Sequence, residues 1–198
     1  MQSAEKERAL VYKVLSLSFF HPTSEVGQVW NAINKLLGDS SEHKGSNAAP
    51  DWRELEFEYN RLFVGPEHVQ CPPYESVYRS DRPDVELGLV MGPSVTDVKR
   101  MYGEAGLGMS KELKELPDHI AIELEFMSSL CLKEAESNDQ READLWRARQ
   151  SEFWRSHLKP WAATFGEMTS LNAISQFYRL SGRLLQQFME EEADYLGV

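Results

Sequence analysis

Apolar residues recur every three or four positions along most of this 198-residue chain. Val26, Val29, Trp30 and Ile33, for example, would share one face of a helix. Neither a repeated unit nor the alternation of a β-strand is visible in the sequence. The apolar stripes predict helices over about 3–21, 24–37, 51–64, 93–106, 117–137, 139–158 and 170–188. We therefore expect an all-α fold, a bundle of about seven or more helices.

Two segments interrupt this helical pattern. Residues 38–50 read GDSSEHKGSNAAP, which is typical of a polar loop. Residues 67–92 contain three prolines and two glycines without a long periodic run, and we expect an ordered, proline-rich loop there. The length suits one domain, so residues 1–198 are expected to form a single helical domain.

The chain is strongly acidic, with 21 basic and 32 acidic residues and a net charge of -11. This balance argues against nucleic-acid binding, which needs clustered lysines and arginines. It suits a basic partner such as an arginine-rich peptide, although the charge can also serve solubility alone. The apolar runs are too short for stable membrane insertion, and the N-terminus mixes acids and Lys13 into its apolar part, unlike a signal peptide. We expect a cytoplasmic protein.

The stretch LPDHIAIELEFM combines a proline, an acid and an imidazole directly before a run of helix formers. Pro117 suits the first turn of a helix, and Asp118 would then meet exposed backbone N–H groups. His119 and Glu123 are four residues apart, so they can share a face and form a hydrogen bond. Glu123 would in that case raise the imidazole pKa. A helix cap, a binding surface, a metal site and a catalytic pair all remain open at this point.

The motifs of common enzymes and metal sites are missing from the sequence. There is no GxSxG, HExxH, ExxH or GxxxxGK[ST] pattern, and the two cysteines, Cys71 and Cys131, form no CxxC. We therefore expect no metal, no cofactor and no catalytic residue. A small helical hydrolase that uses His119 and Glu123 is the alternative from a different functional class.

Three stretches taken together resemble the TorD/DmsD/NarJ family of molybdoenzyme maturation chaperones. They are EYNRLFVGP (58–66), PPYESVY (72–78) and LPDHIAIELEFM (116–127), in this order. The family's aromatic-x-x-Leu-Phe helix end is matched by Tyr59, Leu62 and Phe63, and its Pro-Asp-His element by Pro117, Asp118 and His119. The second and third stretches look nearer the TorD/DmsD branch than the nitrate reductase branch.

The resemblance implies an all-helical, non-catalytic protein that binds the twin-arginine signal peptide of an apo molybdoenzyme and delays its export until the molybdopterin cofactor is inserted. A NarJ-like assembly chaperone for a nitrate reductase subunit that is not exported is the alternative within the family. The protein would be a monomer or a helix-swapped dimer. An apolar groove would take the apolar part of the peptide, while acids attract its arginines. The expected peptide-binding residues are Tyr59, Leu62, Phe63, Pro73, Tyr74, Glu75, Tyr78, Pro117, Asp118, His119 and Glu123.

Overall fold

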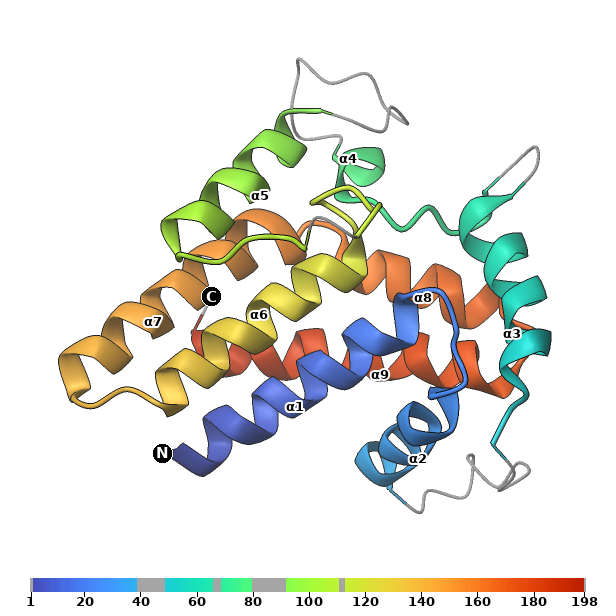
Figure 1. The fold of residues 1–198 in the computed structure, drawn as a ribbon, viewed down its shortest axis with the longest axis horizontal. Coiled ribbons are helices and arrows are strands. Elements are labelled where there is room, and N and C mark those ends of the chain that lie inside the picture. Colours follow the sequence, from blue (N-terminus) through green and yellow to red (C-terminus); the bar gives the residue numbers. More distant parts are fainter. Residues whose placement is uncertain (1, 39–48, 66–68, 80–91, 111–112, 198) are drawn as a thin grey trace.

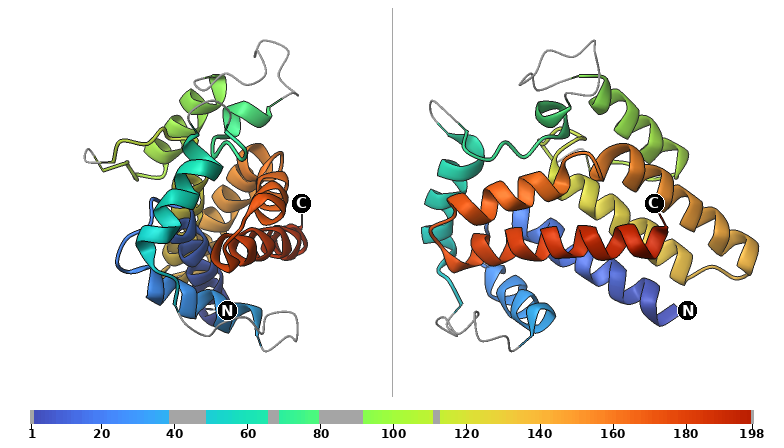
Figure 2. Two further views of the ribbon diagram at one scale, coloured as in Figure 1. Left: turned by 90° about the vertical axis from the view of Figure 1, so that its right-hand side faces the viewer. Right: turned by 180° about the vertical axis from the view of Figure 1, so that it is seen from behind.

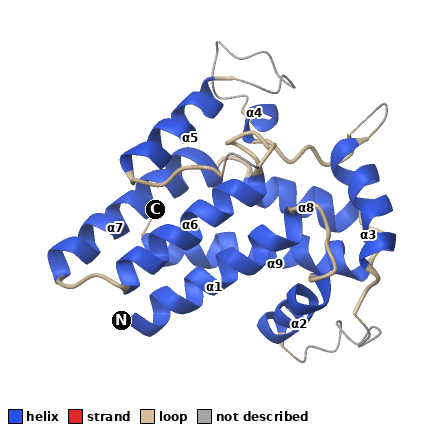
Figure 3. Cartoon of the chain, viewed as in Figure 1, coloured by secondary structure: helices blue, strands red, loops and turns tan. Residues whose placement is uncertain are grey.

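A computed structural model describes residues 2–38, 49–65, 69–79, 92–110 and 113–197. Over these ranges the chain is helical and contains no strand, as Figure 3 shows, so the all-α prediction is confirmed. Most of the predicted polar loop at 38–50 and much of the proline-rich loop at 67–92 lie outside the described residues. The helices are α1 (Gln2–Phe19), α2 (Val26–Leu37), α3 (Trp52–Tyr59), α4 (Glu75–Tyr78), α5 (Pro93–Glu104), α6 (Ile120–Ala135), α7 (Gln140–Phe153), α8 (Ala162–Asn172) and α9 (Gln176–Leu196).

Helix α6 lies at the centre of the fold. It packs along α1 on one side and against α7 on another (Figure 1). Twelve of its 16 residues are buried, so it has no broad polar face of the kind that marks a surface helix. The last residues of the LPDHIAIELEFM stretch therefore belong to the core of the protein.

Single π-helical turns extend two of the helices. Asn60–Val64 continues α3, and Trp154–Leu158 continues α7. The first of these turns holds Leu62 and Phe63, and the second holds His157, all of them buried. Insertions of this kind are frequent at functional sites because they redirect the side chains that follow.

The C-terminal part of the chain differs from the sequence prediction. A single final helix was expected from about residue 170, but α8 and α9 form a hairpin that breaks at residues 173–175 (Figure 2). Ser175 caps α9, and the Glu58 carboxylate of α3 accepts hydrogen bonds from the backbone N–H groups of Ile174 and Ser175, at 2.5 and 3.0 Å. The break is thus stabilised by a residue more than a hundred positions away.

A buried ion pair joins the two ends of the chain. The Arg8 guanidinium of α1 donates to both carboxylate oxygens of Glu192 in α9, at 2.6 and 2.7 Å. The Tyr12 hydroxyl also donates to Glu192, at 2.7 Å. A second carboxylate, that of Glu134, lies 3.9 Å from Arg8. Arg8 and Glu192 are both buried, and a buried charge without a partner is strongly unfavourable. Each residue therefore stabilises the fold chiefly by neutralising the charge of the other.

Glu192→Gln is expected to lower the free energy of unfolding by about 3 kcal/mol, because Arg8 would remain buried with only the more distant Glu134 as counter-charge. Urea denaturation followed by circular dichroism measures the change. Glu190→Gln is the matched control, since it removes the same charge two positions away at an exposed site. Equal losses in the two variants would contradict a specific role of the buried pair.

Candidate functional site

The LPDH stretch positions the start of α6. The helix begins at Ile120 rather than at Pro117, so the prediction that Pro117 opens it was wrong. His119 is the N-cap, and its Nδ1 accepts a hydrogen bond from the backbone N–H of Ala121 at 3.2 Å. The imidazole satisfies a backbone donor that would otherwise lack a partner at the helix start.

Asp118 caps a different helix. Its Oδ2 accepts a hydrogen bond from the backbone N–H of Ser76, in the first turn of α4, at 3.1 Å. The backbone N–H of Glu75 donates to the Asp118 carbonyl at 3.0 Å, and that of Ile120 donates to the Pro73 carbonyl at 2.9 Å. Together with an antiparallel bridge between Tyr74 and His119, these bonds join the stretches 72–78 and 116–123 into one unit.

Three carboxylates gather beneath this unit. Glu75, Asp118 and Glu123 are all fully buried. Glu75 accepts a hydrogen bond from the Arg79 guanidinium at 2.5 Å and lies 2.9 Å from Nδ1 of His157. Glu123 accepts a hydrogen bond from the indole N–H of Trp161 at 3.3 Å. We call Glu75, Arg79, Asp118, Glu123 and His157 the carboxylate cluster.

Burial and mutual repulsion change the acidity of Glu123 and Asp118. Burial raises the pKa of Glu123 well above its ordinary value, and the charges of Glu75 and Asp118 raise it further. Burial also raises the pKa of Asp118, and the hydrogen bonds from Ser76 oppose that change only partly. Among the described residues the cluster therefore combines three carboxyl groups with one guanidinium, a balance that favours the binding of a further positive group.

His119 and Glu123 do not form the pair that their spacing suggested. Glu123 was expected to raise the imidazole pKa, but burial instead lowers the pKa of His119 to about 3. The imidazole is a neutral helix cap, and Glu123 bonds to Trp161. A hydrolase that uses these two residues as a hydrogen-bonded pair has no support in this geometry. Within the described ranges, no group of three or more His, Cys, Asp or Glu side chains could hold a metal ion.

The aromatic stripe of α3 and its π-helical turn faces the core. Tyr59, Leu62 and Phe63 are buried, and the Phe63 ring packs 5.4 Å from that of Tyr178 and 5.8 Å from that of Phe165. These side chains were expected to line an open groove, and in this structure they do not. Tyr74 and Tyr78 are half-buried, and the Tyr74 hydroxyl donates to Glu115 at 2.9 Å. A role of all these residues in peptide binding stays a prediction.

An apolar groove that sequence reasoning missed runs along the outer side of α6. Its volume is about 390 Å³, and it lies between α1, α6 and the segment that follows α5. Ile122 and Phe126, one turn apart on α6, form part of its wall. Apolar or aromatic side chains from the other two elements also line it: Phe20, Leu107, Met109 and Leu113. Polar side chains stand among them: Lys13, Ser110, Glu125 and Ser129. The i, i+4 spacing of Ile122 and Phe126 was the only local signal for this groove.

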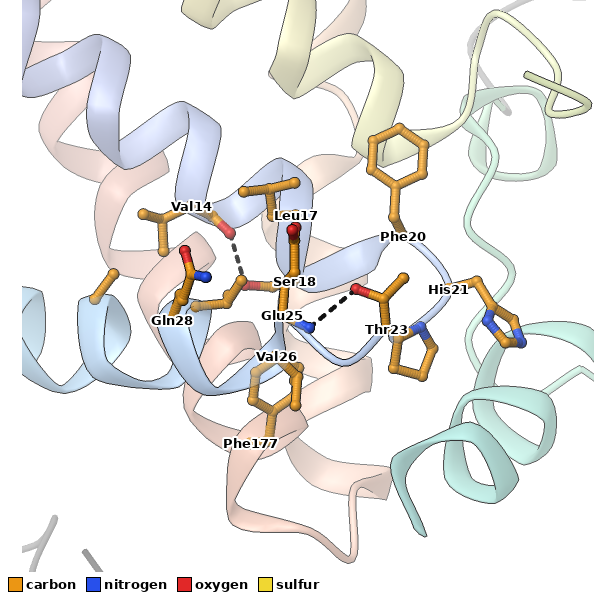
Figure 4. A pocket seen from close by; sticks show the side chains of 13 residues that line it. Val14, Leu17, Ser18, Phe20, His21, Thr23, Glu25, Val26, Gln28 and Phe177 are labelled. Carbon is orange, nitrogen blue, oxygen red and sulfur yellow. Dashed lines mark hydrogen bonds between the residues drawn. The ribbon is translucent and has the colours of Figure 1, made fainter. Parts of the chain in front are cut away.

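A second cavity adjoins the first at Phe20. It has a volume of about 260 Å³ and lies between the C-terminal end of α1 and the start of α2 (Figure 4). Phe20 lines both cavities and stacks on His119, with ring centroids 6.2 Å apart and an interplanar angle of 12°. This one ring thus connects the apolar surface of α1 to the LPDH element.

The arrangement of helices is shared with a solved structure, and the sequence matches a known family. A crystal structure of a putative redox enzyme maturation protein from Archaeoglobus fulgidus has the same fold, with a TM-score of 0.59. The match covers 92% of this chain and 93% of that chain at 24% sequence identity. Residues 21–167 match the model of the nitrate reductase delta subunit family, so the chain belongs to that family. The resemblance to TorD, DmsD and NarJ proteins is thereby confirmed.

Curated relatives extend the likeness over the whole chain. A chaperone protein TorD of Vibrio parahaemolyticus is 24% identical over 193 residues, which cover 98% of this chain and 86% of the relative. A chaperone protein TorD of Vibrio cholerae is 25% identical over 168 residues, covering 85% of this chain and 70% of the relative. In the described ranges, none of the helices has the length and apolar character needed to cross a membrane.

Proposed function

We propose that this protein is a cytoplasmic, non-catalytic chaperone for a molybdopterin-dependent oxidoreductase. It binds the enzyme's twin-arginine signal peptide, its apo form, or both, and delays export until the cofactor is inserted. Two kinds of observation support the proposal: relatives that are named chaperone protein TorD, and a site whose chemistry suits arginine.

The carboxylate cluster is the observation that most favours arginine recognition. It forms where the two motif stretches meet, and one of its carboxylates, that of Glu75, already binds a guanidinium, that of Arg79. A guanidinium offers five N–H donors in a plane and pairs with carboxylates through charge-assisted hydrogen bonds. Lysine lacks this geometry, so the site would distinguish a twin-arginine motif from a twin-lysine motif.

The groove beside α6 supports binding of the apolar part of the same peptide. Glu123 points to the carboxylate cluster, while its chain neighbour Ile122 lines the groove. A peptide with a basic start and an apolar helical continuation therefore meets matching chemistry on two sides of one helix. Docking of the peptide's apolar helix in the groove would supply most of the affinity. The carboxylates of the cluster would fix the register in which the peptide binds.

Titration calorimetry with synthetic leader peptides tests the proposal. We expect a twin-arginine leader to bind at least about tenfold more tightly than the same leader with two lysines, because an ammonium group cannot form the planar, bidentate bonds that a guanidinium forms with carboxylates. Glu123→Gln is expected to weaken binding by about tenfold or more while the protein stays folded, since glutamine resembles the protonated acid that burial favours.

Glu152→Gln is the matched control, because it removes an exposed acid of α7 and should leave affinity unchanged. Equal binding of the arginine and lysine leaders would contradict arginine recognition by this site. No binding to any leader, together with binding to an apo nitrate reductase subunit, would instead favour the assembly chaperone that the description of the matching family suggests.

A further inference from the structure

We propose that Arg79 is an internal occupant of the arginine site, so that a peptide arginine binds by replacing it. This inference rests on the proposed function and adds a mechanism of regulation to the same site. The chain would protect its carboxylate cluster with its own guanidinium until a client peptide arrives.

The contacts of Arg79 are those of a bound ligand arginine. Its Nη1 donates to the Glu75 carboxylate at 2.5 Å and to the backbone carbonyl of Ser156 at 2.6 Å. The residue is 6% exposed, and the Glu75 side chain is completely buried. The other Glu75 oxygen faces His157 at 2.9 Å. As long as Arg79 is in place, an outside arginine cannot reach Glu75.

One guanidinium leaves the cluster incompletely satisfied. Oδ1 of Asp118 and Oε1 of Glu123 are buried and have no hydrogen-bond partner among the described residues. Buried polar atoms of this kind are unfavourable unless a partner is supplied. A guanidinium entering from a peptide would bring several donors to these acceptors, which gives the exchange a driving force.

The element that holds Arg79 is suited to such an exchange. Helix α4 has only four residues, so little of its stability comes from its own hydrogen bonds. Its first turn is held instead by the backbone and side chain of Asp118. Arg79 belongs to the same chain as the site, so its effective concentration there is high. Only the fraction of molecules in which Arg79 has left the site can bind the peptide, and the apparent affinity is reduced accordingly.

Peptide binding to Arg79→Gln tests the inference. We expect the variant to bind the twin-arginine leader about tenfold more tightly than the parent protein, because the internal competitor is gone. Its affinity should also fall more steeply with salt. The parent protein exchanges one ion pair for another, whereas the variant forms a new one. A role of Arg79 in folding alone would change neither quantity in this direction.

Arg155→Gln is the matched control, since Arg155 is exposed two positions from His157 and its loss removes the same charge. Tighter binding in Arg79→Gln but not in Arg155→Gln supports the exchange. Equal or weaker binding in a folded Arg79→Gln protein overturns it, even if the parent protein binds the leader. If neither the parent nor the variant binds, the inference fails together with signal-peptide recognition by this site. Should Arg79→Gln not fold, Arg79→Lys serves instead, with a smaller gain in affinity expected and an unchanged affinity counting against the exchange.

Discussion

Gly182→Ala is expected to destabilise the protein by more than about 3 kcal/mol, because α8 and α9 approach each other too closely there for any side chain. A Cβ atom at Gly182 would overlap the carbonyl oxygen of Gly166 and lie 2.8 Å from the backbone nitrogen of Ser170. Both partners are backbone atoms, so they cannot turn aside as a flexible side chain can. For a chain of this size the loss corresponds to a fall in Tm of roughly 6–12 °C, measurable by differential scanning calorimetry.

Gly103→Ala is the matched control for this prediction. Gly103 lies near the end of α5, and a Cβ there would meet nothing within 4 Å. The same substitution should therefore be neutral or raise stability by up to about 1 kcal/mol, because alanine favours the helix. If the two variants lose equal stability, close packing of α8 on α9 is not what requires Gly182.

The starts of several helices could be predicted because their signals are local. Asp51 and Asp139 precede apolar stripes in the sequence, and in the structure each side chain accepts a hydrogen bond from a backbone N–H within its own first turn, at 2.9 Å. Pro93 stands in the first turn of α5 as expected. Such interactions span two or three residues, so the sequence alone contains them.

The roles of Asp118 and Glu58 could not be predicted in this way. Asp118 looked like the cap of the helix that follows it, but it stabilises α4, 42 positions earlier in the chain. Glu58 stabilises the break between α8 and α9. In both cases the partner is chosen by tertiary packing, and no pattern within a helical turn reveals it.

In the candidate site, too, some residues could be predicted from the sequence and others could not. The resemblance placed Glu75, Asp118 and Glu123 in one list of residues, and the structure brings their carboxylates together. His157 and Trp161, which bond to two of them, come from a different part of the chain and had no local signature. Arg79 had a weak one, since it stands four positions after Glu75 and ion pairs favour that spacing in a helix.

Acid is expected to destabilise the protein through His119. The imidazole titrates near pH 6.5 in an unfolded chain, and burial lowers its pKa to about 3 in the fold. Between these values the unfolded state binds a proton that the folded state does not, so stability falls as the pH falls. The contribution of His119 amounts to roughly 4 kcal/mol over three pH units. The raised pKa values of Asp118 and Glu123 act in the opposite direction, because those acids gain protons more readily in the fold.

Comparison with His119→Asn separates the imidazole from these acids. Asparagine is a favourable N-cap whose oxygen can accept the Ala121 N–H, and it cannot take up a proton in this range. Urea denaturation at successive pH values should show the parent protein losing stability relative to the variant as the pH falls from 6.5 toward 4. The loss of stacking on Phe20 would shift the variant by an amount that does not depend on pH. His21→Asn is the matched control, because it changes an exposed histidine. This variant should lose stability in acid as the parent protein does. Parallel curves for the parent and His119→Asn would mean that the fold does not hold this imidazole neutral, and the cap at the start of α6 would then be a charged group facing the positive end of its own helix.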